Sequence, residues 1–220
     1  MAAPAPAPTP PHRVTATVLR PVGTPVPLGF LALAGAAFVT AGLQLGWTPP
    51  AERAAAGTVM IAFAFPLQLL ASVLGFRARD TAFGTAMAVL AGSWLVQGVV
   101  LSAGPLPGTR HALGLFLLVT AASLLVPIAA ADTGKIAATV VIACASLRLG
   151  ATGLHELTRA PEWETASGVI GLVLTAAALY AAAAFALEDT RHRPVLPVGR
   201  PGSRSTAVRQ RTEPGERPEL

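Results

Sequence analysis

The first long apolar run, residues 28–47, constrains the fold of this chain more than any other feature. It holds no charged residue, and Gln44 is its one strongly polar side chain. At about 1.5 Å rise per residue, a helix of this length crosses the roughly 30 Å hydrocarbon core of a bilayer. Pro25 and Pro27 stand at its start. Because proline fixes φ and lacks an N–H, we expect the helix to begin at about Pro27.

Five further apolar runs follow, separated by short segments rich in proline, glycine and charged residues. With 53% hydrophobic and 12% charged residues, the chain is not an ordinary soluble domain. We therefore expect an all-α integral membrane protein with six transmembrane helices in a bundle. The expected spans are 28–47, 55–76, 82–103, 112–130, 136–154 and 165–187. A polar loop is expected after the fifth span, containing His155, Glu156, Arg159, Glu162, Trp163 and Glu164.

Both ends of the chain are expected to lie outside the transmembrane domain, which we assign to residues 23–199. Residues 1–22 begin with a Pro/Ala tract that cannot bury enough surface to fold. Within them, 13–22 have the apolar and basic pattern of a short amphipathic helix on the inner leaflet. Residues 200–220 are rich in Arg, Gly, Pro and Glu, so we expect a disordered basic tail. No apolar stretch of a secretory signal precedes the first span.

The distribution of Arg and Lys predicts that both termini are cytoplasmic. Twelve of these residues fall on the side that carries both ends and the loops 77–81 and 131–135, and three fall on the other side. Excess positive charge stays in the cytoplasm, and here the two ends supply the excess. We therefore expect a multi-pass protein of the cell membrane. The same distribution explains the net charge of +5 without nucleic-acid binding.

Motifs for catalysis are absent from the sequence. There is no phosphate-binding loop, no nucleophile elbow and no cluster of metal ligands, so we expect no enzyme activity, cofactor or metal. Cys144 is the one cysteine, which excludes an intrachain disulfide.

Three segments resemble the acetate uptake transporters, also called succinate–acetate permeases. Residues 24–30, Thr-Pro-Val-Pro-Leu-Gly-Phe, are similar to the Asn-Pro-Ala-Pro-Leu-Gly-Leu that opens the first span in that family. A second similarity extends without a gap from Gln68 to Trp94-Leu95. The third comprises Gly171, Tyr180 and the exit 193–199, Arg-Pro-Val-Leu-Pro-Val-Gly, against Arg-Thr-Val-Leu-Pro-Ile-Gly in the family. Together they cover roughly residues 21–199.

This resemblance implies six helices around a narrow pore in each protomer and a ring-shaped homo-oligomer, a hexamer in the family. It also implies uptake of acetate or related short mono- and dicarboxylates with protons. Counting from the matched segments places three apolar gate positions at Leu33, Leu90 and either Cys144 or Ala145. The substrate pathway implied by the resemblance comprises Thr24, Pro25, Pro27, Leu28, Gly29, Leu33, Gln68, Leu90, Cys144, Ala145 and Tyr180.

The chain departs from the family at positions that bear on transport. The first two gate positions are typically aromatic in the family and are aliphatic here. Thr24 replaces an Asn, and Gly75 replaces a Glu at the end of the second span. The helix start at 27–29 offers unpaired N–H groups to an anion, although two prolines at this place also serve simply to begin a span.

Arg148 is the one charged residue well inside an expected span. A cation there costs about 2.5 to 3.5 kcal/mol on insertion scales, so it usually faces a cavity or a partner. It follows the third gate position by three or four residues and therefore shares its helical face. We hypothesise that Arg148 holds a carboxylate beside the gate. In the alternative, its side chain extends along the helix to the outer interface about 9 Å away.

Two other functions fit the sequence besides proton-coupled carboxylate uptake. A passive channel for small weak acids or neutral solutes is favoured by the aliphatic gate positions and by the lack of a carboxylate deep in any span. The third candidate is a membrane protein that transports nothing and acts through its basic tail as an interaction or regulatory element. Uptake with and without a proton gradient separates the first two, and any carboxylate movement in liposomes excludes the third.

Overall fold

The computed structural model describes residues 23–104, 109–131, 136–191, 193 and 195–198. The tails predicted over 1–22 and 200–220 lie outside these residues. Six helical segments of the described chain are long and apolar enough to cross a membrane, which confirms the predicted all-α membrane fold. The elements are α1 Val26–Gln44, η1 Pro50–Glu52, α2 Arg53–Val59, η2 Met60–Ala64, α3 Phe65–Arg77, α4 Thr81–Ala103, α5 Thr109–Ser123, α6 Leu125–Ala130, α7 Ile136–Thr158 and α8 Pro161–Arg191.

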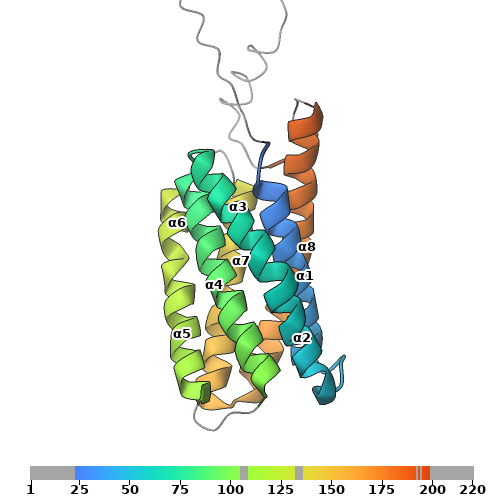
Figure 1. Ribbon diagram of the computed structural model, residues 1–220, viewed down its shortest axis with the longest axis vertical. Helices are drawn as coiled ribbons and strands as arrows, with labels where there is room; N and C mark the ends of the chain where they lie inside the picture. Colours follow the sequence, from blue (N-terminus) through green and yellow to red (C-terminus); the bar gives the residue numbers. More distant parts are fainter. Residues whose placement is uncertain (1–22, 105–108, 132–135, 192, 194, 199–220) are drawn as a thin grey trace, which may run out of the picture.

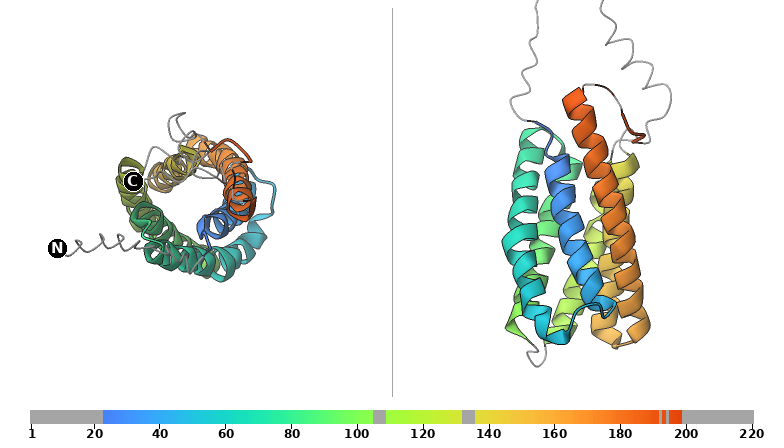
Figure 2. Two further views of the ribbon diagram at one scale, coloured as in Figure 1. Left: turned by 90° about the horizontal axis from the view of Figure 1, so that it is seen from above. Right: turned by 90° about the vertical axis from the view of Figure 1, so that its right-hand side faces the viewer.

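The spanning segments stand side by side in one bundle (Figure 1), and seen from one end they form a ring with α1 on its inner side (Figure 2). α1 packs chiefly against α8 and α3. It is the most buried span, because 61% of the residues in its apolar stretch are buried inside the molecule. The first helix therefore forms the core of the bundle. It begins at Val26 with Pro25 as its N-cap, one residue before the predicted start.

The second span contains a π-helical segment, η2, directly before Pro66. Proline removes one backbone hydrogen bond from a helix, and its ring clashes with the carbonyl four residues earlier. The wider turn of a π-helix accommodates this clash while the helix continues. The span therefore extends unbroken over Pro50–Arg77, five residues longer at its start than predicted. A similar irregularity divides the fourth span at Leu124, three residues before Pro127.

The prediction of a long polar loop between the fifth and sixth spans is wrong. α7 continues to Thr158 and α8 begins at Pro161, so the connection is only Arg159 and Ala160. Pro161 stands at the first helical position, where proline suits a helix, and two glutamates in the first turn favour the positive end of the helix dipole. Charged residues at this place therefore start a helix instead of breaking one.

Candidate functional site

A cavity of about 540 Å³ opens at the end of the bundle where α1, α4 and α7 begin. Its walls come from these three helices, from the turn between α3 and α4, and from α6. Asp80, in that turn, caps α4 by accepting a hydrogen bond of 3.0 Å from the Phe83 N–H. The polar lining is Arg79, Asp80, Thr81, Thr85 and Thr139, and the apolar lining includes Val26, Phe30, Phe83, Ala86, Pro127 and Ile142.

The predicted gate positions lie one helical turn deeper than this cavity. On α1, α4 and α7, the lining residues Phe30, Ala86 and Ile142 are followed three or four residues later by Leu33, Leu90 and Ala145. Residues at these spacings share a helix face. The three deeper side chains are at most 1% exposed and belong to one apolar cluster. Apolar side chains therefore close the bundle beyond the cavity.

The two residues predicted for the fifth-span gate position, Cys144 and Ala145, differ in burial. Ala145 is buried within the apolar cluster, whereas Cys144 is half-buried and packs against the edge of that cluster. Of the two candidates, Ala145 is therefore the one on the inward face of α7, and its role in a gate stays a prediction.

Arg148 lies one turn beyond the gate, and its side chain is buried. Only 1% of the residue is exposed, which contradicts the alternative that the side chain extends to the outer interface. Its Nη2 donates to Thr40 Oγ1 on α1 at 2.5 Å. Its guanidinium carbon lies 5.3 Å from the ring centroid of Trp94 on α4. Arg148 therefore extends from α7 into the centre of the bundle.

Among the described residues, no acidic side chain pairs with Arg148, in contrast to Arg110, which pairs with Glu156. The Nε of Arg148 is buried and makes no hydrogen bond there. Room beside this nitrogen comes from Gly171 of α8, where an added Cβ would stand 3.2 Å from Nε. The bundle thus surrounds a cation and leaves one of its donors unpaired.

Polar side chains continue from Arg148 toward the opposite end of the bundle. Thr152 Oγ1 donates to the Arg148 carbonyl at 3.0 Å and lies 2.6 Å from Ser167 Oγ. Gln44 Nε2 donates to Thr152 Oγ1 at 3.4 Å, and Ser167 Oγ donates to Gln44 Oε1 at 3.2 Å. These residues come from α1, α7 and α8, so a hydrogen-bonded polar column follows the gate.

The pathway positions predicted at the start of α1 are not among the residues that line the cavity. Pro25 and Gly29 are buried, and Thr24, Pro27 and Leu28 are half-buried. A Cβ added at Gly29 would stand 2.6 Å from Met87 Sδ and 3.1 Å from Phe83 Cζ, both on α4. Gly29 therefore allows α1 to approach α4 closely, which differs from the expected approach of its backbone to an anion.

Gln68, on α3, links that helix to α1 and α4. Its Nε2, on α3, donates to the Gly29 carbonyl of α1 at 3.4 Å and lies 3.9 Å from Met87 Sδ of α4. The side chain is fully buried, and its Oε1 has no partner in the described part of the chain. Gln68 thus packs behind the cavity wall, close to the gate.

Tyr180 does not lie where the resemblance placed it. It is 42% exposed on α8, and its hydroxyl donates to the Pro197 carbonyl at 2.8 Å. It is not part of the cavity lining. The hydrogen bond of Tyr180 instead holds the segment around Pro197, which follows α8, against the outer face of that helix.

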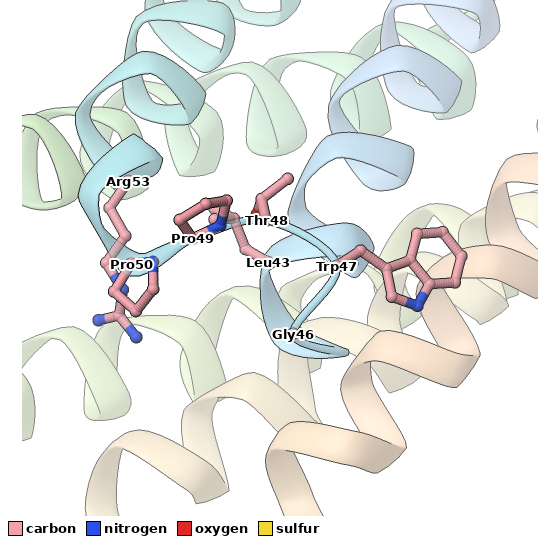
Figure 3. Close-up of a pocket in the computed structure, with 7 residues that line it drawn as sticks. All are labelled: Leu43, Gly46, Trp47, Thr48, Pro49, Pro50 and Arg53. Carbon is pink, nitrogen blue, oxygen red and sulfur yellow. The ribbon is translucent and has the colours of Figure 1, made fainter.

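A second cavity, of about 350 Å³, lies at the opposite end of the bundle in the turn between α1 and α2. Figure 3 shows Trp47 pointing away from Pro49, Pro50 and Arg53, which form the other part of its lining. No residue of the gate or of the Arg148 cluster borders it. This cavity therefore belongs to the surface turn.

Sequence reasoning missed the apolar residues that line the first cavity. Phe30 and Ile142 each precede a gate position by three residues, so their helical spacing was the available signal. Thr85 also lines the cavity. Among the described residues, no group of three or more His, Cys, Asp or Glu side chains is placed to hold a metal ion.

Comparison with solved structures supports the fold, whereas comparison of the sequence finds no match. No family model matches the chain, and no curated protein matches its sequence. Among solved structures, one described as the structure of the bacterial acetate channel SatP superposes with a TM-score of 0.73 at 20% sequence identity. The match covers 81% of this chain and 99% of that one. The chain, with its six apolar helices, therefore has the fold of that channel.

Proposed function

We propose that this protein is a membrane passage for acetate and related short carboxylates, and a divergent member of the acetate uptake transporter family. The observation that carries the proposal is the alignment of the cavity with the closed apolar layer of Leu33, Leu90 and Ala145, on faces shared by α1, α4 and α7. The fold of an acetate channel supports the same function.

The geometry suggests a simple sequence of events. In uptake, a small solute reaches the apolar layer from the opposite end of the bundle and, once across it, leaves through the cavity past Phe30 and Ile142 and the polar rim at Arg79 and Thr81. Passage then requires Leu33 and Leu90 to change rotamer, because both are fully buried in this conformation. A narrow apolar layer excludes hydrated ions, since stripping their water costs far more than a small organic acid requires.

Proton-coupled uptake is the mode that we propose from the family resemblance. Its competitor is a passive channel for weak acids or neutral solutes, and one observation favours that competitor. Within the described spans, the acidic residues stand near helix ends, so no carboxylate is placed as a proton relay in the middle of the membrane. In proton-coupled uptake, the proton would then travel on the undissociated acid.

We also propose a homo-oligomer, by resemblance a hexamer, in the cell membrane with both termini in the cytoplasm. Large apolar side chains on the outer faces support insertion among lipids or neighbouring protomers, for example Leu115, Val119 and Leu147, each more than 60% exposed. In this orientation the cavity opens to the cytoplasm.

Uptake by purified protein in liposomes tests the proposed function. Labelled acetate, propionate, succinate and lactate are compared with urea and glycerol, with and without an imposed proton gradient. Saturable acetate uptake that follows the gradient supports the symport, and uptake that ignores it selects the passive channel. If no carboxylate enters faster than in empty liposomes, the protein is not a carboxylate passage.

A further inference from the structure

The Arg148 cluster carries an inference beyond the passage of carboxylates in general. Arg148 stands in the middle of α7, about 18 Å along the helix from its start at 1.5 Å per residue. Taking a guanidinium out of water costs several kcal/mol unless an anion compensates it. Since Arg stays protonated in proteins, the bundle holds a permanent positive charge at this depth. An anion from solution would balance it.

The hydrogen-bonding capacity of the cluster is also incomplete. Arg148 Nε and Trp94 Nε1 are both buried donors without an acceptor in the described part of the chain. Buried donors are rarely left unpaired, because each costs about 1 to 3 kcal/mol. Both donors belong to the Arg148–Trp94 pair, whose guanidinium carbon lies 5.3 Å from the ring centroid, so we infer that an acceptor from outside the chain completes this cluster.

The geometry around the guanidinium suits a carboxylate. The Nε and Nη2 edge of an arginine presents two parallel N–H groups that match the two oxygens of a carboxylate. Thr40 occupies Nη2 in this structure, but its hydroxyl also donates to the Ala36 carbonyl at 2.8 Å and keeps that bond when the arginine turns to a ligand. Gly171 packs closely against Nε, since an added Cβ would stand 3.2 Å from it, so this edge of the guanidinium becomes accessible to a carboxylate when the arginine turns.

We propose that Arg148 and Trp94 form a carboxylate-binding site directly behind the apolar gate, and that this site selects monocarboxylate anions. The selection follows because Arg148 is the one charged side chain in the middle of the described spans. The second carboxylate of a dicarboxylate would be buried without a partner. This proposal rests on the proposed carboxylate passage and defines the form in which the substrate binds.

Binding and uptake by matched variants test the site. Acetate binding is measured as the rise in melting temperature of purified protein with sodium acetate against sodium chloride. The half-saturating acetate concentration is measured in liposomes. For Arg148→Gln we expect no acetate-dependent rise and a half-saturating concentration at least tenfold higher. Arg148→Lys keeps the charge without the paired donors, and Gly171→Ala crowds Nε, so both are expected to give intermediate values.

Arg110→Gln is the matched control, because Arg110 pairs with Glu156 at 2.7 Å near a bundle end, away from the gate. It is expected to retain wild-type saturation within twofold. In the wild type, propionate is expected to compete with acetate at least tenfold better than succinate does.

The outcomes separate the two proposals. If the wild type moves no carboxylate, the proposed function fails. If it moves acetate and Arg148→Gln saturates and is stabilised as the wild type is, only the Arg148 site is overturned. Should Arg148→Gln fail to fold, Gly171→Ala with wild-type saturation and equal competition by succinate and propionate overturns the site as well.

Discussion

The guanidinium of Arg148 lies against the indole of Trp94, with its central carbon 5.3 Å from the ring centroid. The contact joins α7 to α4, two helices that otherwise pack mainly against other neighbours. A cation over a tryptophan face is stabilised by about 2 kcal/mol when both groups are desolvated. This pair therefore holds α7 and α4 together, one helical turn beyond the predicted gate positions.

Replacement of Trp94 is expected to destabilise the fold strongly. Trp94→Leu removes the face that holds Arg148 and leaves a void, for a loss of about 2 to 4 kcal/mol in the free energy of unfolding. Thermal unfolding of purified protein checks this. The control is Trp47→Leu, because Trp47 is 58% exposed and its replacement should change stability little. Equal losses of unfolding free energy in Trp94→Leu and Trp47→Leu would contradict a stabilising contact between Trp94 and Arg148.

Shortening a gate side chain is expected to widen the passage. Leu90→Ala deletes part of a side chain that is 1% exposed, so it should raise the uptake of butyrate relative to acetate several-fold. The same change should cost about 2 to 5 kcal/mol in unfolding free energy. Leu147→Ala is the control, since Leu147 is 65% exposed on α7. An unchanged butyrate-to-acetate ratio in Leu90→Ala would remove Leu90 from the gate.

Two glycines on α4 are expected to respond to alanine in opposite directions. A Cβ at Gly98 would stand 2.8 Å from the Gly57 carbonyl of α2, whereas a Cβ at Gly92 meets no atom within 4 Å. Gly98→Ala should push α2 away and lower the melting temperature by several degrees. Gly92→Ala should leave it unchanged or raise it, because alanine favours the helix by up to about 1 kcal/mol. Similar melting temperatures for both variants would contradict close packing of α2 on α4.

Much of the fold was predictable because membrane spans depend on a local property. A run of about 20 uncharged apolar residues has few alternatives to a spanning helix, so the run at 28–47 predicts α1 from the sequence alone. The ends of spans were less predictable. Glu162 and Glu164 read as loop residues, yet at the start of α8 they favour the helix dipole and continue the helix.

The candidate site was only partly predictable because it depends on which faces meet. Counting along the chain predicted gate positions at Leu33 and Leu90. The structure shows both side chains buried, and their role as a gate stays a prediction. Counting could not show that Arg148 turns inward, since its partners Thr40 and Trp94 come from helices distant in sequence. It placed Tyr180 in the pathway, although the hydroxyl finds its acceptor, the Pro197 carbonyl, outside the bundle.

The most direct measurement of a carboxylate path through this cavity is chemical blockade at its wall. Thr85 is half-buried in the lining, and cysteine is close to threonine in size. Thr85→Cys is made in a Cys144→Ala background that still transports acetate, and a negatively charged methanethiosulfonate is applied from the cavity side. Glu162→Cys, at an exposed position on α8, is the control. We predict that complete modification, verified by mass spectrometry, abolishes acetate uptake in Thr85→Cys and spares it in Glu162→Cys. Undiminished uptake after complete modification of Thr85→Cys would contradict a path through the cavity.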